Sequence, residues 1–309
     1  MKLYLGIDGG GTKTKIIIID ECNNIVFTNT SGPSSIDTVD NQTTLNNIKV
    51  AIDPFVNEFP ETIFNGVFAG LGGIVFEEDC LMVENLLRQL KQVTTSTFIR
   101  ARNDMHNALY SSDHFDSGMT LICGTGMVAF GLKDGLTHKC GGWGFKEGEQ
   151  GSGYHLGREA IRYCVRAHDG RYQLDEFAKE VANVIGLKKS PDIINIMEDY
   201  NGKRTKTASL APLVTKYANL GNEYAKRICD KATDELALAI QGVYNTLKFD
   251  SVTLVIVGSL GNSRGYFGDL LIEKIKKISD KINVTSPVID PALAAAKAAK
   301  YFCEVKKWF

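Results

Sequence analysis

The chain has 309 residues, a formal net charge of −1, and 44% hydrophobic and 23% charged residues. This composition is typical of a globular protein with enough residues for two medium domains. Binders of nucleic acids and anionic membranes normally carry a concentrated excess of Lys and Arg, which this chain lacks. We therefore expect no nucleic-acid or membrane partner, and a small-molecule substrate.

The cysteines and the apolar segments indicate a cytoplasmic protein. The seven cysteines are scattered, odd in number and never spaced as C-x-x-C, so neither a disulfide framework nor a zinc site is expected. The opening sequence MKLYLGID lacks the long apolar run of a secretory signal. The longest apolar stretches are far shorter than the roughly 20 residues that span a bilayer.

The first part of the chain reads as alternating strands and helices. Three short strands are expected at residues 3–8, 14–20 and 24–29, joined by a glycine-rich turn and a polar turn, which predicts an antiparallel meander. Helices are then expected at 43–58 and 78–91, and strands at 63–69 and 97–101. This alternation is typical of an α/β domain.

The opening pattern then restarts. The segment GMTLICGTGMVAFGLKDG again reads as strand, glycine-rich turn and strand, which indicates an internal structural duplication. The chain is then mainly helical from 151 to 247, and a buried strand follows at 253–257. An Ala-rich helix is expected from Pro291 to Cys303, because Pro is favoured at the first helical position. We expect one domain at 1–115, completed by the returning segment 291–309, and a second domain at 116–290.

The first glycine-rich turn is a candidate phosphate site. Consecutive glycines let backbone N–H groups converge on an anion without Cβ atoms in the way. The turn is not a P-loop, because Thr12 intervenes before Lys13 and a strand follows in place of a helix. Asp8, at the strand end beside these amides, is a candidate Mg²⁺ ligand. The candidate nucleotide-binding residues here are Asp8, Gly9, Gly10, Gly11, Thr12, Lys13 and Thr14.

The second glycine-rich turn, Gly124-Thr125-Gly126, occupies the matching position in the repeated segment. Alone, such a tripeptide is usually a plain turn. In the repeated context it is a candidate for binding phosphates from the other side, so that two hairpins would hold a triphosphate.

Asn103 and Asp104 follow an apolar strand and precede a helical segment. Asp is a preferred N-cap, so one reading is purely structural. The other reading makes Asp104 the base that accepts the proton of an acceptor hydroxyl during phosphoryl transfer. Both readings can hold together.

A glycine-rich loop spans residues 141–153 and carries Trp143 and two carboxylates. Loops of this composition tend to be binding loops. A Trp face and carboxylate acceptors suit a polyhydroxylated ring, whereas the structural reading is a shaped loop around a buried Trp.

These motifs, in this order, resemble the BadF/BadG/BcrA/BcrD ATPase family and its N-acetylglucosamine kinase members, within the actin, hexokinase and Hsp70 superfamily. The motifs are DGGGTKT, Asn103-Asp104, CGTG, GGWGFKEGEQGSGY, VGSLG and PALAAAKAA. The resemblance covers essentially the whole chain.

The resemblance implies two ribonuclease-H-like, actin-like ATPase domains with ATP in the cleft between them. It implies an ATP- and Mg²⁺-dependent kinase in which Asp104 acts on the 6-hydroxyl of an amino sugar. It also suggests a homodimer. The residues it assigns to adenosine are Gly258, Ser259 and Gly261, and those on the sugar side are Ser35, Asp37, Asn103, Asp104, Gly142, Trp143, Gly144 and Glu149.

Two departures from the family pattern fall on the sugar side. Gly148-Glu149-Gln150-Gly151-Ser152 stands where amino-sugar kinases usually read GDEGS, and the early loop 32–37 lacks the Asn that is often found there. N-acetylglucosamine, glucosamine and N-acetylmuramic acid therefore remain open as substrates.

Two other functions are considered. The activator ATPases of this family serve 2-hydroxyacyl-CoA dehydratase and benzoyl-CoA reductase systems through an iron–sulfur cluster shared by two subunits, which needs suitably placed cysteines. The scattered cysteines argue against that function. The third possibility is a non-enzymatic, actin-like assembly protein, in which Asp104 and the Trp143 loop would have no evident task.

Overall fold

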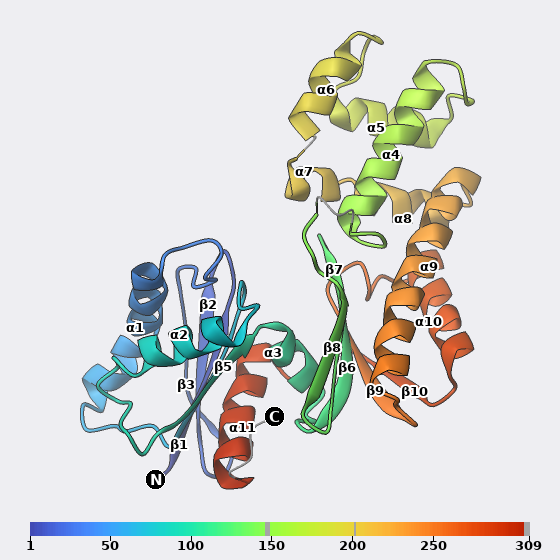
Figure 1. The fold of residues 1–309 in the computed structure, drawn as a ribbon. Helices are drawn as coiled ribbons and strands as arrows, with labels where there is room; N and C mark the ends of the chain where they lie inside the picture. The colour runs from blue at the N-terminus through green and yellow to red at the C-terminus, as the bar shows by residue number, and fades with distance from the viewer. Residues whose placement is uncertain (146–148, 201, 306–309) are drawn as a thin grey trace. The chain divides into compact units, whose positions relative to one another are not determined.

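The computed structural model describes residues 1–145, 149–200 and 202–305 (Figure 1). The chain divides into two compact units. Unit 1 contains Met1–Gly118 and Pro287–Phe309, and unit 2 contains Met119–Ser286. Each unit is built on a five-stranded sheet with helices, so the predicted α/β class is confirmed.

The sheet of unit 1 has the order β3-β2-β1-β4-β5. The first three strands pair antiparallel, as the sequence predicted, whereas β1, β4 and β5 pair in parallel. The strands are β1 Leu3–Gly9, β2 Thr14–Asp20, β3 Ile25–Ser31, β4 Gly66–Leu71 and β5 Phe98–Asn103. The helices are α1 Asn41–Glu58, α2 Glu77–Leu87, α3 Met105–Tyr110 and α11 Pro291–Val305.

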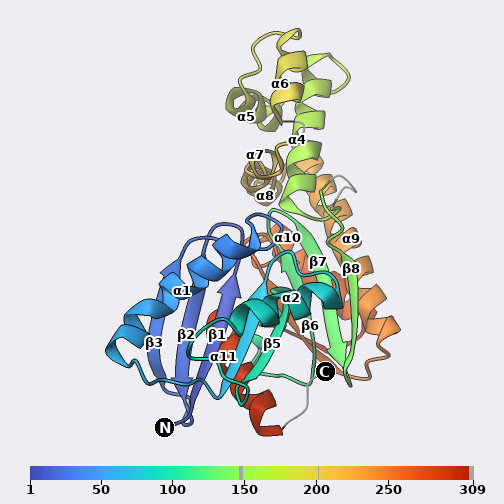
Figure 2. The same ribbon diagram turned by 60° about the vertical axis from the view of Figure 1, so that its left-hand side comes forward.

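Helices cover both faces of this sheet (Figure 2). Leu5 and Ile7 of β1 share a core with the apolar residues of α1 and α2. The opposite face receives α11, whose alanines are fully buried against β1 and β4. A Cβ on Gly6 would lie 2.1 Å from the backbone nitrogen of Ala296, so small residues on both sides permit this close approach. The end of the chain thereby becomes part of the first unit.

The sheet of unit 2 has the order β10-β9-β6-β7-β8. If the strands of unit 2 are numbered from β6 as the first, the order read from β8 is 3-2-1-4-5, as in unit 1. This agreement supports the duplication read from the sequence. The strands are β6 Ser117–Cys123, β7 Met127–Lys133, β8 Leu136–Gly141, β9 Val252–Val257 and β10 Ile282–Thr285. The short strand β10 pairs in parallel with β9 and was not predicted.

Seven helices of unit 2 are described, and they supply most of its apolar core. Ser152 and Asp175 cap α4 and α5, and Gly186 ends α5 in the left-handed conformation. The helices are α4 Gly153–His168, α5 Glu176–Ile185, α6 Asp192–Tyr200, α7 Arg204–Ala208, α8 Ala211–Asn219, α9 Glu223–Thr246 and α10 Tyr266–Ile278. Among the described residues, no helix combines the length and apolar character needed to cross a bilayer.

Candidate active site

The glycine turn after β1 is a tight hairpin with a second loop packed on it. The backbone N–H of Gly10 donates to the carbonyl of Lys13 at 2.9 Å. The backbone N–H groups of Ser34 and Ser35 both donate to the carbonyl of Gly10. A Cβ on Gly9 would lie 2.1 Å from the Ser34 hydroxyl, which explains the glycine there. Gly11, Thr12 and Lys13 remain exposed at the tip.

Asp8 lies at the end of β1, immediately before this turn. Its Oδ1 accepts a hydrogen bond from Nδ2 of Asn107 at 2.8 Å. Burial raises the pKa of the Asp8 carboxyl, and the charge of Asp290 raises it further. Sequence reasoning missed Asn107, although its place one helical turn after Asp104 was a usable signal.

Asp104 begins α3, but its side chain makes no capping hydrogen bond. The cap is Asn103, whose Oδ1 accepts from the backbone N–H of Met105 at 3.0 Å and whose Nδ2 donates to the carbonyl of Ile74 at 2.8 Å. The structural reading of Asp104 is therefore wrong, and both polar ends of the Asn103 amide are engaged within the protein. Burial, followed by repulsion from Asp8 and Asp37, raises the pKa of Asp104 to about 6.

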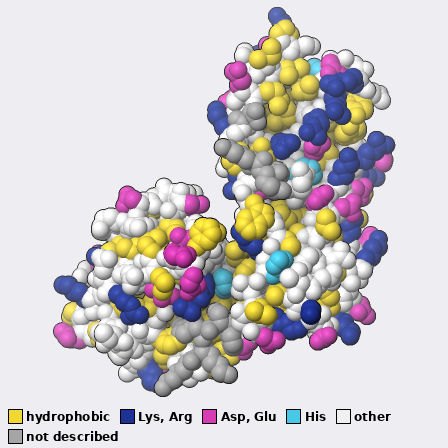
Figure 3. Space-filling view, in the orientation of Figure 1, with side chains coloured by type: hydrophobic (Ala, Val, Ile, Leu, Met, Phe, Trp, Pro, Cys, Tyr) yellow, Lys and Arg dark blue, Asp and Glu magenta, His cyan; other side chains and the backbone are white. Residues whose placement is uncertain are grey.

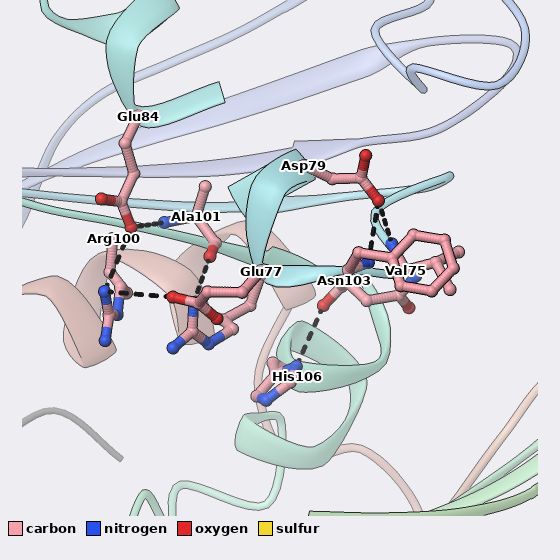
Figure 4. Close-up of polar contacts among 10 residues, drawn as sticks. Val75, Glu77, Asp79, Glu84, Arg100, Ala101, Asn103 and His106 are labelled. Carbon is pink, nitrogen blue, oxygen red and sulfur yellow. Dashed lines mark hydrogen bonds and ion pairs between the residues drawn. The ribbon is translucent and has the colours of Figure 1, made fainter. Parts of the chain in front are cut away.

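The strand that leads to Asp104 is fixed by charged side chains of α2 (Figure 4). Glu84 accepts from the backbone N–H of Ala101 at 3.2 Å and pairs with Arg100 at 3.4 Å. Glu77 pairs with Arg102 at 3.5 Å. Figure 4 also shows His106 turned toward the carbonyl of Asn103, at 3.3 Å. These contacts hold β5 and the start of α3 in place.

The loop 32–37 reaches the same region. The buried Ser35 hydroxyl donates to Asp37, and a Cβ on Gly72 would lie 2.4 Å from the Ser35 hydroxyl and 3.7 Å from Oδ2 of Asp104. Gly72 therefore lies between Ser35 and Asp104, two of the predicted sugar-side residues, and its lack of a side chain leaves room for both. Unit 1 brings Asp8, Ser35, Asp37 and Asp104 together, and we call these four residues the unit 1 cluster.

In unit 2, a cavity of about 400 Å³ lies at the second glycine turn. Three predicted nucleotide residues line it: Gly124, Thr125 and Ser259. Its remaining wall comes mainly from α7 and α8, including the hydroxyl-bearing residues Thr205, Ser209 and Thr215. Sequence reasoning did not assign these three residues, because nothing in their local sequence separates them from ordinary polar helix residues.

The turn after β9 packs tightly against the end of β6. Gly258 has φ +103°, and a Cβ there would lie 2.3 Å from the carbonyl oxygen of Cys123. The backbone N–H of Gly261 donates to the same carbonyl at 3.0 Å. Gly258 and Gly261 thus shape the turn that carries Ser259, and they do not themselves line the cavity.

The predicted sugar loop places its residues in different surroundings. Gly142, Trp143 and Gly144 are exposed, the two glycines have positive φ, and Lys139 Nζ lies 3.8 Å from the centroid of the Trp143 ring. Trp143 is 64% exposed, so the reading of a loop built around a buried Trp is wrong. Residues 146–148 of the loop lie outside the described part of the chain.

Glu149 is only 3% exposed and forms an ion pair that the sequence did not predict. Its two carboxylate oxygens accept from Nε and Nη2 of Arg204, 55 positions away. A Cβ on Gly126 would lie 1.8 Å from Arg204 Nη2 and 2.9 Å from Glu149 Oε1. The pair therefore lies directly against the second glycine turn, and Gly126 leaves room for it.

The chain matches the model of the BadF/BadG/BcrA/BcrD ATPase family from residue 5 to residue 299. The chain belongs to this family. It is 28% identical to an N-acetyl-D-glucosamine kinase of Dictyostelium discoideum, over 96% of this chain and 98% of the relative. It is 27% identical to an N-acetylmuramic acid/N-acetylglucosamine kinase of Clostridium acetobutylicum, over 98% of this chain and 100% of the relative.

Solved structures agree on the fold. A candidate N-acetylglucosamine kinase from Chromobacterium violaceum superposes with a TM-score of 0.70 at 20% identity, covering 97% of this chain and 99% of that one. A ROK family glucokinase from Streptomyces griseus, in complex with glucose and AMPPNP, gives a TM-score of 0.53 at 15% identity. The match covers 97% of this chain and 98% of that one. The two-domain fold of actin-like ATPase sugar kinases predicted from the motifs is thus confirmed for this chain.

Proposed function

We propose that this protein is a sugar kinase that transfers the γ-phosphate of ATP to the 6-hydroxyl of an amino sugar. The observation that carries the proposal is the state of Asp104. Its carboxylate makes no capping hydrogen bond to α3, lies beside the glycine turn of its own unit, and has a pKa raised to about 6. Full-length similarity to two amino-sugar kinases supports the same reaction.

Asp104 would act as the general base. A carboxylate whose pKa is near 6 is ionised at neutral pH, and it is a stronger base than an ordinary Asp. It would accept the proton of the sugar hydroxyl as the oxygen attacks the γ-phosphorus and ADP leaves. Proton transfer of this kind contributes roughly 10²- to 10⁴-fold to the rate, and positioning supplies much of the remainder.

The nucleotide would be held from both units by their own glycine turns. In unit 1, the exposed backbone of Gly11, Thr12 and Lys13 would contact phosphate oxygens, and Gly9, Gly10 and Thr14 would keep the turn in shape. In unit 2, Gly124 and Thr125 would contact the phosphates, with Gly126 allowing the close approach of Arg204. Ser259 would lie on the adenosine side of the unit 2 cavity, supported by Gly258 and Gly261.

Asp8 fits the requirement for Mg²⁺. The described residues hold no group of three or more His, Cys, Asp or Glu side chains suited to a metal. Mg²⁺ in kinases is commonly held by one or two carboxylates, with phosphates and water completing its shell. The raised pKa of Asp8 and its repulsion of Asp104 indicate a region where a cation would stabilise the carboxylates. Bound Mg²⁺ would offset the charge of the transferring phosphoryl group.

The sugar would be recognised by residues of both units. Ser35, Asp37 and Asn103 would define the acceptor side in unit 1, where Asn103 acts by fixing the start of α3. Gly142, Trp143 and Gly144 would offer an apolar face to the ring, and Glu149 would bind a hydroxyl only if it left Arg204. N-acetylglucosamine is the first candidate, and glucosamine and N-acetylmuramic acid are the others. A homodimer in the cytoplasm, where ATP is available, completes the proposal.

A coupled ADP-release assay over hexoses, amino sugars and muramic acid derivatives tests the reaction, with a no-sugar control. We expect ADP formation that depends on an amino sugar, and a 6-phosphorylated product by ³¹P and ¹H NMR. Equal ADP release with and without sugar would instead favour an ATPase of the activator type.

A further inference from the structure

A second, larger cavity lies in the helical part of unit 2, separate from the nucleotide cavity. It has a volume of about 780 Å³, within the range of small-molecule sites. It runs along α4 and is closed by residues of α6 and α7. None of its lining residues lines the cavity of Gly124, Thr125 and Ser259, and the proposed reaction gives it no task.

Among the described residues, the charged groups that line this cavity all have one sign. Four arginines line it, and no described Asp or Glu does: Arg158, Arg162, Arg166 and Arg171. The first three recur every four residues along α4, so they lie on one face of the helix. Figure 3 shows Lys and Arg side chains beside hydrophobic ones over this helical part. A hollow lined by a single sign of charge attracts ligands of the opposite sign.

Two of these arginines have no carboxylate partner within the described residues. Arg162 pairs with Glu159 at 2.7 Å, and Arg171 pairs through two atoms with Asp169. Arg158 instead lies over the ring of Tyr154, with 5.6 Å between the guanidinium carbon and the ring centroid. Arg166 donates to the hydroxyl of Tyr172 at 3.4 Å and also contacts the hydroxyl of Tyr224, and neither of these partners is a carboxylate. Their charges are therefore available to a bound anion.

Most of the remaining lining is apolar. Ile161 of α4 is buried at the base, and Ile193 and Met197 of α6 form the facing wall. Phe145 packs edge-on against Tyr154, with ring centroids 5.5 Å apart. A free inorganic anion would use only the arginines, whereas an organic anion would also bury these surfaces.

We propose that this cavity is a second ligand site, which binds a small organic anion. The phosphate or carboxylate of the ligand would contact Arg158 and Arg166, and its apolar part would lie on Ile161, Ile193 and Met197. Guanidinium groups suit both kinds of head group, because their N–H donors match two oxygens at once.

The site is tested with 8-anilinonaphthalene-1-sulfonate, a fluorescent apolar anion, added to the whole protein. We expect saturable binding of one probe per chain. Arg158→Gln and Arg166→Gln should each weaken it about ten-fold, since a hydrogen bond to a charged group is worth roughly 1.5–3 kcal/mol. Arg227→Gln is the matched control, because Arg227 lies on a neighbouring cavity and carries the same charge. Circular dichroism and the melting temperature confirm that each variant is folded.

Displacement of the probe then distinguishes the two sources of negative charge. N-acetylglucosamine 6-phosphate carries a phosphate, N-acetylmuramic acid carries a carboxylate, and neutral N-acetylglucosamine should displace nothing. Asp104→Asn separates this cavity from the unit 1 cluster, because displacement should persist in that variant. The proposal is overturned if both Arg variants bind the probe as wild type does, if Arg227→Gln weakens binding equally, or if neither anion displaces the probe.

Discussion

Glu149 and Arg204 form an ion pair closed by two hydrogen bonds, Nε to Oε2 at 2.9 Å and Nη2 to Oε1 at 2.6 Å. The carboxylate side chain is 3% exposed and the guanidinium side chain 41%. Glu149 therefore has little access to water, and Arg204 donates two hydrogen bonds to its carboxylate. The pair ties the loop before α4 to the start of α7, and both side chains lie against Gly126.

Removing Arg204 should cost more stability than removing both partners. Arg204→Met removes two charge-assisted hydrogen bonds from the buried Glu149 carboxylate, and breaking a fully buried pair costs about 3–5 kcal/mol. The partial exposure of Arg204 lowers our expectation to about 1–3 kcal/mol. Glu149→Gln/Arg204→Met should recover part of this loss. Urea denaturation of the two single variants and the double variant measures the coupling, and additive losses would contradict the pairing.

Gly258 should tolerate no side chain. Gly258→Ala combines positive φ with a Cβ placed 2.3 Å from the carbonyl oxygen of Cys123, so we expect a loss of about 2–4 kcal/mol in the free energy of unfolding. Gly170→Ala is the matched control, because Gly170 has φ +83° and nothing within 4 Å of its Cβ position. That variant should lose only about 1–2 kcal/mol. Equal losses would mean that the contact with Cys123 is unimportant.

Gly124→Ala should separate nucleotide binding from folding. A Cβ at Gly124 meets nothing within 4 Å, so the melting temperature should stay within about 2 °C of wild type. Gly124 also lines the unit 2 cavity, where a methyl group would occupy space needed by a phosphate. We expect calorimetry to show at least ten-fold weaker ATP binding. Unchanged affinity in a stable variant would remove this turn from the nucleotide site.

Asp104 should reduce the stability of the folded protein at neutral pH. Its folded pKa of about 6 lies above its ordinary value of 3.8. Between these values the unfolded chain binds fewer protons than the native protein, so this group lowers stability as pH rises from about 4 to 6. Asp104→Asn removes the effect and should be about 1–3 kcal/mol more stable than wild type at pH 7.5. Denaturation at pH 7.5 and pH 4.5 should show that this gain falls to about a third at the lower pH, where the unfolded carboxyl is still mostly ionised.

The sequence predicted elements well where the signal was local. The strands β1 to β3 follow from short apolar runs punctuated by glycine and polar turns, and α11 follows from Pro291 and its alanines. The four-residue strand β10 was missed, because only its parallel partner β9 makes it a strand. Asp104 was given a possible capping role from residue preference, whereas Asn103 performs it.

The site was predictable only in part, for a similar reason. Glycine turns can be recognised in the sequence, whereas the residues that pack against them cannot. Arg204 reaches Gly126 from a distant helix, and Thr205, Ser209 and Thr215 line the nucleotide cavity only through the folding of α7 and α8. The four-residue spacing of Arg158, Arg162 and Arg166 can be read in the sequence, but the cavity that they line also needs Ile193 and Met197 of α6, which come later in the chain.

Sugar-dependent ADP formation by wild type and Asp104→Asn, measured beside ATP affinity, tests the central claim most directly. We predict that wild-type kcat/KM falls below about pH 6, as the base becomes protonated. Asp104→Asn should lose roughly 10²- to 10⁴-fold in kcat while binding ATP with wild-type affinity. Turnover in Asp104→Asn within a few-fold of wild type would contradict the account.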